Sequence, residues 1–283
     1  SKIKPSDLVI YELSSHQLYR LKKSPKIAVL LNIYPAHLDY FKNFKEYIDT
    51  KSNIVRFQKK NDYLIYNHND KIIKNITKSV KSKLIPIKLS RLKQIKNPLI
   101  GDFNFLNIAA ALTIAKLFKI KEKTINEALK GFKNQLHRLD YIGKFKGITF
   151  YDDSASTIPE STIGAIGALE KNIETVILGG FENNISFEAL ARKIVKSKIK
   201  NLILFPTTGQ KIWQEITQIN KSKIIYPFFV NTMKDAVKIA YLKTQKGKAC
   251  LLSPSSQSFG IFKDYKERGD LFVKYVKYFA KKR

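Results

Sequence analysis

Two patterns of apolar residues divide the chain. In the first half, Leu8–Leu13 and Ile27–Ile33 are apolar runs of strand length. Such runs are typical of strands buried on both faces of a parallel sheet. The other elements expected here are helices at Phe41–Phe57, Phe105–Phe118 and Thr124–Phe132, and a strand at Tyr63–Tyr66. The Lys-rich segment between residues 71 and 98 contains short apolar runs but predicts no element.

From Tyr141 onward the pattern becomes a regular alternation of short apolar runs and amphipathic segments. The predicted strands are Ile148–Tyr151, Thr175–Leu178, Asn201–Phe205, Ile224–Phe229 and Ala249–Leu252. The predicted helices are Ser161–Leu169, Phe187–Val195, Gln210–Ile216, Met233–Leu242 and Tyr265–Phe279. This alternation predicts a doubly wound, Rossmann-like α/β domain. We expect two α/β domains, residues 1–135 and 136–283, of which only the second is complete.

Composition narrows the class of protein. The longest apolar runs are too short to span a membrane. Residues 1–7 lack the apolar core of a signal peptide. Because the chain has one cysteine, Cys250, it cannot form an internal disulfide bond. We therefore expect a cytoplasmic protein without a membrane partner. The net charge of +29 suits an anionic partner, but it comes from 45 lysines and only seven arginines spread along the whole chain. Dedicated nucleic-acid surfaces cluster their charge and use Arg, so nucleic-acid binding is the weaker alternative.

Two side chains follow predicted strands of the first domain. Glu12 comes directly after the run from Leu8 to Tyr11, and His37 comes soon after Ile27–Ile33. Parallel strands would bring both side chains to one carboxyl edge of the sheet. A carboxylate and an imidazole there suit a divalent cation that bridges nucleotide phosphates. On spacing alone, ordinary loop residues remain the alternative.

A turn into a helix carries two asparagines. Asn104 and Asn107 lie three residues apart and share a helical face. Their amides could offer a donor and an acceptor to a purine edge. Helix capping is the alternative for Asn104.

The most specific stretch of the chain runs from Leu251 to Asp270, where an apolar run ends in a Ser/Pro/Gly loop that leads into a charged helix. A parallel sheet builds ligand sites in this way, at the carboxyl edge of a strand. The stretch resembles the "LLSP…SFD.F..(Y/F)..RG..F" signature of the Mur ligase family, in the branch that adds D-glutamate. Further stretches resemble family motifs in the same order: "ELSS.QL" at Glu12–Leu18, "N…DHLD" at Asn32–Asp39, "G.HN..N..AA" from Gly101, "HR(L/M)E" at His137–Asp140 and "DS.AT.PE(A/S)T" from Asp153.

The resemblance implies roles for individual residues. The metal ligands would be Glu12, His37 and Lys51, with Lys51 carbamylated so that it holds a second Mg²⁺. The catalytic residues would be Lys51, His37 and Arg138. ATP would contact Asn104, Asn107, Arg138 and Asp153. The substrates would contact Gln17, Ser154, Thr157, Asn183, Ser258 and Tyr265. Asn183 stands where the family has a basic residue for the D-glutamate side chain, and an amide cannot pair that charge.

The resemblance also implies a reaction of peptidoglycan synthesis. ATP would phosphorylate the carboxylate of UDP-N-acetylmuramoyl-L-alanine, and the amine of D-glutamate would attack the acyl phosphate to give an amide, ADP and phosphate. Residues 1–135 would be the carboxyl-terminal part of a central ATP-binding domain, and residues 136–283 the amino-acid-binding domain. Because no glycine-rich phosphate loop is present, we expect this chain alone to be inactive. We also expect it to be a monomer. A sister ligase with another amino-acid specificity is the remaining enzyme alternative.

Overall fold

The computed structural model describes residues 2–4, 6–89, 99–101, 103–181, 185–220 and 222–282. The chain divides into two compact units, residues 1–88 and 89–283, and each is described by itself. This division groups helices α4 (Phe103–Leu117) and α5 (Glu122–Gly131) with the second unit. This division by contacts does not test the domain boundary predicted after Gln135, which stays a prediction. Along the described ranges, no helix is both long and apolar enough to cross a membrane.

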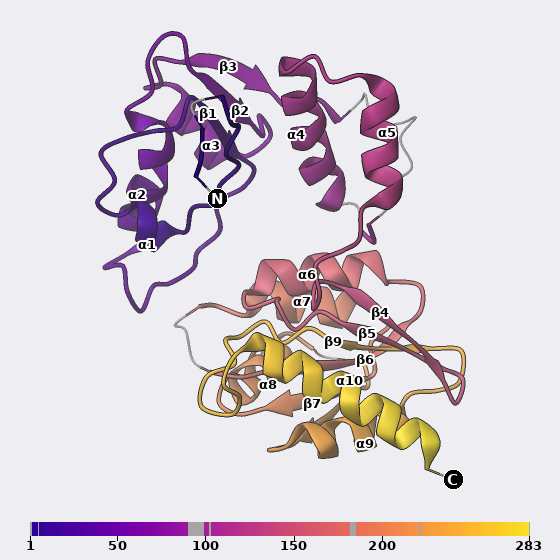
Figure 1. Cartoon of the computed structure of the whole chain (residues 1–283). Coiled ribbons are helices and arrows are strands. Elements are labelled where there is room, and N and C mark those ends of the chain that lie inside the picture. Colours follow the sequence, from indigo (N-terminus) through magenta and orange to yellow (C-terminus); the bar gives the residue numbers. More distant parts are fainter. Residues whose placement is uncertain are drawn as a thin grey trace. The chain divides into compact units, whose positions relative to one another are not determined.

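The first unit is built on a small parallel sheet with helices beside it (Figure 1). Its strands pair in the order β1-β2-β3, and the core centres on Leu64 and Ile65 of the middle strand, which have no exposed surface. The strands are β1 Ile27–Leu30, β2 Tyr63–Tyr66 and β3 Lys83–Pro86, and the helices are α1 Ser15–Leu18, α2 Phe44–Arg56 and α3 Lys71–Thr77.

Helix α2 begins three residues later than the sequence predicts. The Asn43 side chain accepts the backbone N–H of Glu46 at 3.0 Å and caps the helix. Phe41, just before the cap, is 2% exposed and lies in the core with Tyr47 and Val55. The sequence prediction therefore began the helix at Phe41, an apolar core residue that lies before the helix.

The predicted strand Leu8–Leu13 is wrong for this structure. The segment is described and forms no strand, and Leu8 and Ile10 are 60% and 88% exposed. Within the described residues, β1 pairs with β2 alone. An apolar run becomes a strand only when a neighbouring strand satisfies its backbone groups, and the sequence does not say which neighbour does so.

The second unit contains a six-stranded sheet in the order β4-β5-β9-β6-β7-β8, parallel except for the pairing of β4 with β5. Its strands are β4 Asp140–Phe145, β5 Ile148–Asp152, β6 Ile173–Gly179, β7 Asn201–Phe205, β8 Tyr226–Phe229 and β9 Ala249–Leu252. Its other helices are α6 Pro159–Ala168, α7 Glu188–Lys196, α8 Thr208–Ile219, α9 Met233–Lys243 and α10 Tyr265–Lys281. The predicted doubly wound fold is confirmed.

Helices cover both faces of this sheet (Figure 1). Successive residues of β6 point to opposite sides, so Val176 and Leu178 pack with α6, α7 and α8, whereas Ile177 packs with α9 and α10. Every residue of β6 is buried. The sheet therefore forms the middle of a three-layer domain, and its strand ends are the places left for a ligand.

Candidate functional site

The carboxyl ends of the central strands meet at one edge of the second sheet, as predicted. Strand β5 ends at Asp152, β9 leads into Ser253–Ser256, and β6 leads into Gly180. The loops after β6 and β9 touch, because the backbone N–H of Phe181 donates to the carbonyl of Gln257 at 2.9 Å. Segments that are 76 residues apart in sequence, at Phe181 and Gln257, thus meet at one edge.

Asp153 is buried at this edge and links several segments through hydrogen bonds. Its carboxylate accepts the Leu139 N–H at 3.1 Å, the Ser156 hydroxyl at 2.5 Å and the Ser253 hydroxyl at 2.7 Å. Burial raises the pKa of Asp153 to about 7, against the lowering effect of these hydrogen bonds. The side chain ties the loops after β5 and β9 to the turn before β4. Its predicted contact with ATP stays a prediction.

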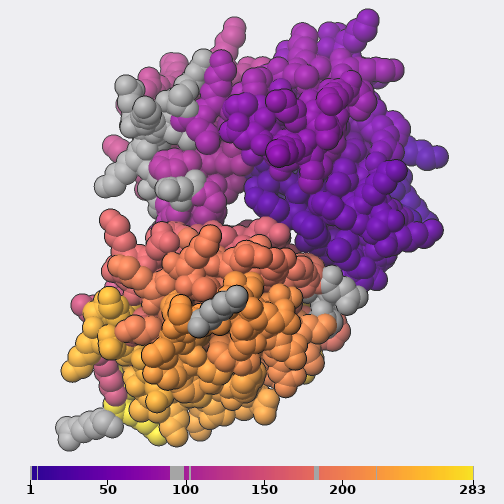
Figure 2. Space-filling view, turned by 180° about the vertical axis from the view of Figure 1, so that it is seen from behind, coloured from indigo at the N-terminus to yellow at the C-terminus, as the bar shows by residue number. Residues whose placement is uncertain are grey.

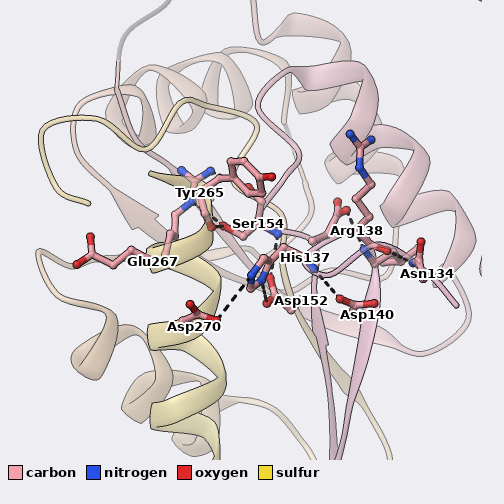
Figure 3. Close-up of polar contacts among 12 residues, drawn as sticks. Asn134, His137, Arg138, Asp140, Asp152, Ser154, Tyr265, Glu267 and Asp270 are labelled. Carbon is pink, nitrogen blue, oxygen red and sulfur yellow. Dashed lines mark hydrogen bonds and ion pairs between the residues drawn. The ribbon is translucent and has the colours of Figure 1, made fainter. Parts of the chain in front are cut away.

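Arg268 of α10 holds the neighbouring residues in place. Its side chain has no exposed surface, and it donates to the Ser154 hydroxyl at 3.0 Å, the Ser154 carbonyl at 2.8 Å and the Ser256 carbonyl at 3.1 Å. The Ser154 hydroxyl in turn donates to the Tyr265 carbonyl at 2.8 Å (Figure 3). Burial lowers the pKa of Arg268 to about 10. The guanidinium fixes two predicted substrate residues, Ser154 and Tyr265, in one arrangement.

Sequence reasoning did not assign Arg268 a role. A single charged residue in an amphipathic helix normally faces solvent, so composition gives no reason to bury it. The available signal was the Arg-Gly pair inside the stretch from Leu251 to Asp270. In the structure, Gly269 lets the helix approach His137, which explains the glycine of that pair.

His137 forms a second polar cluster with Asp152 and Asp270. Its Nδ1 lies 2.8 Å from an Asp152 oxygen and its Nε2 lies 3.7 Å from Asp270 (Figure 3). The hydrogen bond with Asp152 raises the pKa of His137, although burial acts in the opposite direction. Arg138 follows at once in the chain, but its side chain is exposed and points away from the His137 ring (Figure 3). The Asp152 carboxylate at the end of β5 thus orients the His137 ring, while the Arg138 guanidinium stays exposed.

Three other predicted substrate residues are placed less fully. Ser258 is 4% exposed, and its carbonyl accepts the Phe262 N–H at 3.0 Å. Thr157 is partly exposed in the loop after β5. Asn183 lies outside the described residues.

The asparagine pair lies on one helical face, as predicted. The Asn107 amide donates to the Asn104 side-chain oxygen at 3.1 Å, and the Asn104 amide donates to the Ile100 carbonyl at 2.8 Å. Asn104 is buried, whereas Asn107 is exposed. Asn104 therefore stabilises the start of α4, close to the capping alternative, and Asn107 is the accessible member of the pair.

In the first unit, charge interactions link the three predicted metal-site residues. Burial lowers the pKa of Lys51, and the carboxylate of Glu12 acts in the opposite direction. Burial is also the main cause of the lowered pKa of His37, and the positive charge of Lys51 adds a smaller contribution in the same direction. The Lys51 ammonium also lies 5.4 Å from the Tyr47 ring centroid. His37 has a backbone φ of 55°, a left-handed conformation at the turn after β1. The structure thus brings Glu12, His37 and Lys51 into one electrostatic neighbourhood.

Gln17 serves the local fold of α1. Its side-chain oxygen accepts the Ser14 N–H at 2.9 Å, and the Ser14 hydroxyl accepts the Gln17 N–H at 3.3 Å. This reciprocal pair is a capping box. The Gln17 amide also donates to the Tyr11 hydroxyl at 2.9 Å. Its predicted substrate contact stays a prediction.

Glu12, His37 and Lys51 are the predicted ligands of a divalent cation. Among the described residues, no three His, Cys, Asp or Glu side chains gather as a metal cluster. Glu12 and His37 can supply a carboxylate and an imidazole, both suitable for a divalent cation. A third anionic oxygen ligand at Lys51 would complete a set that the unmodified chain lacks. The residues present therefore fit a divalent cation whose remaining ligands would be water or nucleotide phosphate oxygens.

Comparison with known proteins defines the class. Solved structures that share this fold include a MurF from Acinetobacter baumannii, with TM-score 0.71 and 17% identity over 93% of this chain and 62% of that one. Another is the Thermotoga maritima MurF ligase in complex with ADP, with TM-score 0.64 and 18% identity over 90% of this chain and 63% of that one. Residues 2–90 match the model of the Mur ligase middle domain.

Two curated relatives are similar to this chain over almost its whole length. A UDP-N-acetylmuramoylalanine–D-glutamate ligase of Caldanaerobacter subterraneus subsp. tengcongensis is 33% identical over 96% of this chain. An enzyme of the same name from Geobacillus sp. (strain WCH70) is 31% identical, also over 96%. The chain spans 64% of the length of these relatives. This chain is therefore similar to members of the Mur ligase family over nearly its whole length, and residues 2–90 match the middle domain of that family.

We predict that Gly269→Ala destabilises the second unit. A Cβ there would lie 2.1 Å from His137 Nδ1 and 2.8 Å from an Asp152 oxygen. Overpacking of this kind typically costs about 1–3 kcal/mol in the free energy of unfolding. Gly131→Ala is the matched control, because a Cβ at Gly131 meets nothing within 4 Å. Urea unfolding measures both variants, and equal stability of the two would contradict the close packing.

Asp153 should make stability depend on pH. Its folded-state pKa of about 7 lies above the ordinary value of 3.8 for an aspartate, so the folded protein binds the proton more tightly than the unfolded chain. The free energy of unfolding should therefore fall as pH rises from about 4 to 7, by roughly 2–4 kcal/mol from this group. Asp153→Asn should remove that part of the decrease.

The measurement is urea unfolding at pH 5 and pH 7.5, compared among the wild type, Asp153→Asn and the control Asp49→Asn. Asp49 is an exposed carboxylate of α2. Parallel pH dependence of the wild type and Asp153→Asn would show that the buried carboxyl does not titrate in this range.

Proposed function

We propose that the protein carrying these 283 residues is an ATP-dependent ligase that adds D-glutamate to UDP-N-acetylmuramoyl-L-alanine in peptidoglycan synthesis. The observation that carries the proposal is the 33% identity to a ligase of that name across 96% of this chain. The assembled carboxyl edge of the second sheet supports it. This edge combines the loops after β5, β6 and β9, where α/β proteins bind their ligands.

The proposal divides the described residues into two groups by accessibility. Arg138 and Asn107 are exposed and can reach ATP, with Arg138 neutralising charge that develops on the transferred phosphate. Asp153 and Asn104 are buried and hydrogen-bonded. We assign these two the task of fixing the loop and the helix that carry the accessible contacts.

The amino acid would lie at the carboxyl edge of the second sheet. We assign its carboxylate contacts to Ser154, Thr157, Ser258 and the region of Tyr265. Arg268 acts as a positioning residue for this group, since it holds Ser154 through both its hydroxyl and its carbonyl. We further propose Asn183 as the residue nearest the side chain of the incoming amino acid.

We propose that Lys51 is carbamylated and that Glu12, His37 and the carbamate hold Mg²⁺. The electrostatic proximity of the three residues supports this assignment. In carbamate formation, the neutral Lys51 amine attacks the carbon of CO₂, an N–C bond forms, and the amine gives up a proton to solvent. The product carries a carboxylate-like oxygen ligand in place of a cation. Bound Mg²⁺ would supply charge neutralisation for the nucleotide phosphates.

A sister ligase with a different amino acid is the second candidate. Asn183 favours it, because an amide replaces the base that the D-glutamate branch uses for a carboxylate. A folylpolyglutamate synthase of Mycobacterium tuberculosis shares the fold with TM-score 0.61 at 8% identity, so the fold itself does not select among amino acids.

An amino-acid panel tests the function. The native protein that contains this sequence is assayed for ADP release and amide formation with UDP-N-acetylmuramoyl-L-alanine, ATP and Mg²⁺. We expect D-glutamate to be accepted, and L-glutamate, L-lysine and diaminopimelate to give background rates. A preference for a diamino acid would assign the sister ligase, and no ATP-dependent amide with any member would refute the ligase reading.

We predict that Lys51→Ala abolishes ligase activity, and that a short carboxylic acid partly restores it by occupying the place of the carbamate. Bicarbonate should not restore it, because the amine is gone. Lys45→Ala is the matched control, an exposed lysine of the same helix α2. Near-normal turnover of Lys51→Ala would refute the carbamate role while leaving the ligase assignment to the panel.

A further inference from the structure

The second unit contains a groove at the edge of the sheet opposite the candidate site. It is lined by residues at the amino ends of β6, β7, β8 and β9, and its volume is about 1020 Å³. That size is at the upper end of the range for small-molecule sites. Figure 2 shows the second unit from behind, with the chain region of β7 and β8 in orange. No residue assigned to the proposed ligase function lines this groove.

The walls of the groove carry a strong excess of positive charge. Five lysines line it, against a single carboxylate, that of Glu174: they are Lys198, Lys200, Lys223, Lys243 and Lys248. The Glu174 carboxylate is already satisfied, because one oxygen lies 3.4 Å from the Lys200 ammonium and the other accepts the Gln245 N–H at 2.7 Å. Glu174 is 3% exposed, so its charge turns inward rather than toward a ligand.

Two of the five lysines serve the fold. Lys223 donates to the carbonyls of Ile194 and Ser197, at 2.9 and 2.8 Å, and so caps the carboxyl end of α7. Lys200 is the ion-pair partner of Glu174. The positive charge available to a ligand therefore comes from Lys198, Lys243 and Lys248.

The groove also has an aromatic wall. The Lys243 ammonium lies 5.5 Å from the centroid of the Phe228 ring, and Tyr226 lines the same groove while 52% exposed. A cation over a ring face is held in place without losing its charge. Apolar walls also reduce the screening of that charge by water. Because Lys198, Lys243 and Lys248 line one concavity, they can surround a compact anion from more than one side.

We propose that this groove is an anion site for a compact ligand with several phosphate groups, separate from the carboxyl-edge site. Lysine ammonium groups bind phosphate oxygens as point charges, and three of them around one concavity match clustered negative charge. The proposal does not depend on the ligase function, since it rests only on residues 173–248. It also gives a local role to part of the charge excess of a chain with formal net charge +29.

Titration calorimetry of the 283-residue chain with sodium tripolyphosphate, at an ionic strength of about 0.1 M, tests the proposal. We expect one saturable site. The double variant Lys198→Gln/Lys243→Gln should weaken binding by roughly tenfold or more, because two charge-assisted contacts are lost. The control double variant Lys234→Gln/Lys277→Gln removes equal charge from exposed positions outside the groove, and it should weaken binding less than about twofold.

The proposal is overturned if tripolyphosphate gives no saturable binding. It is overturned equally if the two double variants lose the same affinity, because the attraction would then come from the diffuse lysine charge. Circular dichroism checks that the variants are folded. If the groove double variant is not, Lys248→Gln replaces it, with an expected loss of roughly threefold against Lys277→Gln alone.

Discussion

A buried guanidinium and the carboxylates around it determine the geometry of the candidate site. Removing Arg268 from water is costly, and three hydrogen bonds from its guanidinium to oxygens of Ser154 and Ser256 offset that cost. Asp152 adds a favourable charge and at the same time holds His137 and the Ser154 N–H. A partly satisfied network of this kind would be less stable than an apolar one, so its members depend on one another.

This dependence explains why distant segments act together. Asp153 ties the loops after β5 and β9 to the turn before β4, and Arg268 ties the same two loops to α10. Residues 153–156 and 253–258 contain mostly serines and few apolar side chains, so hydrophobic packing alone would leave these parts of the loops free to move. Rigid side chains around a ligand lower the cost of binding it, and a buried polar network supplies that rigidity here.

The sequence predicts the interior of the second unit better than its surface. Strands β6, β7 and β9 are buried on both faces, so their apolar runs stand out and β7 and β9 match residue for residue. Strand β4 was missed because it is a half-exposed edge strand. The run from Leu8 to Tyr11 was wrongly assigned because apolar composition does not specify a pairing partner. The parallel-sheet rule correctly gathered the loops after β5, β6 and β9 at one edge, but no local pattern reveals that Arg268 is buried.

Hydrogen exchange of the chain with Arg268→Lys tests the central claim most directly. Lysine keeps the charge but cannot reach the hydroxyl and both carbonyls at once. We expect faster amide exchange at residues 153–156 and 254–258, with β6 and β7 as protected as in the wild type. Unchanged exchange in those loops would contradict the account, because the loops would then be ordered without the guanidinium.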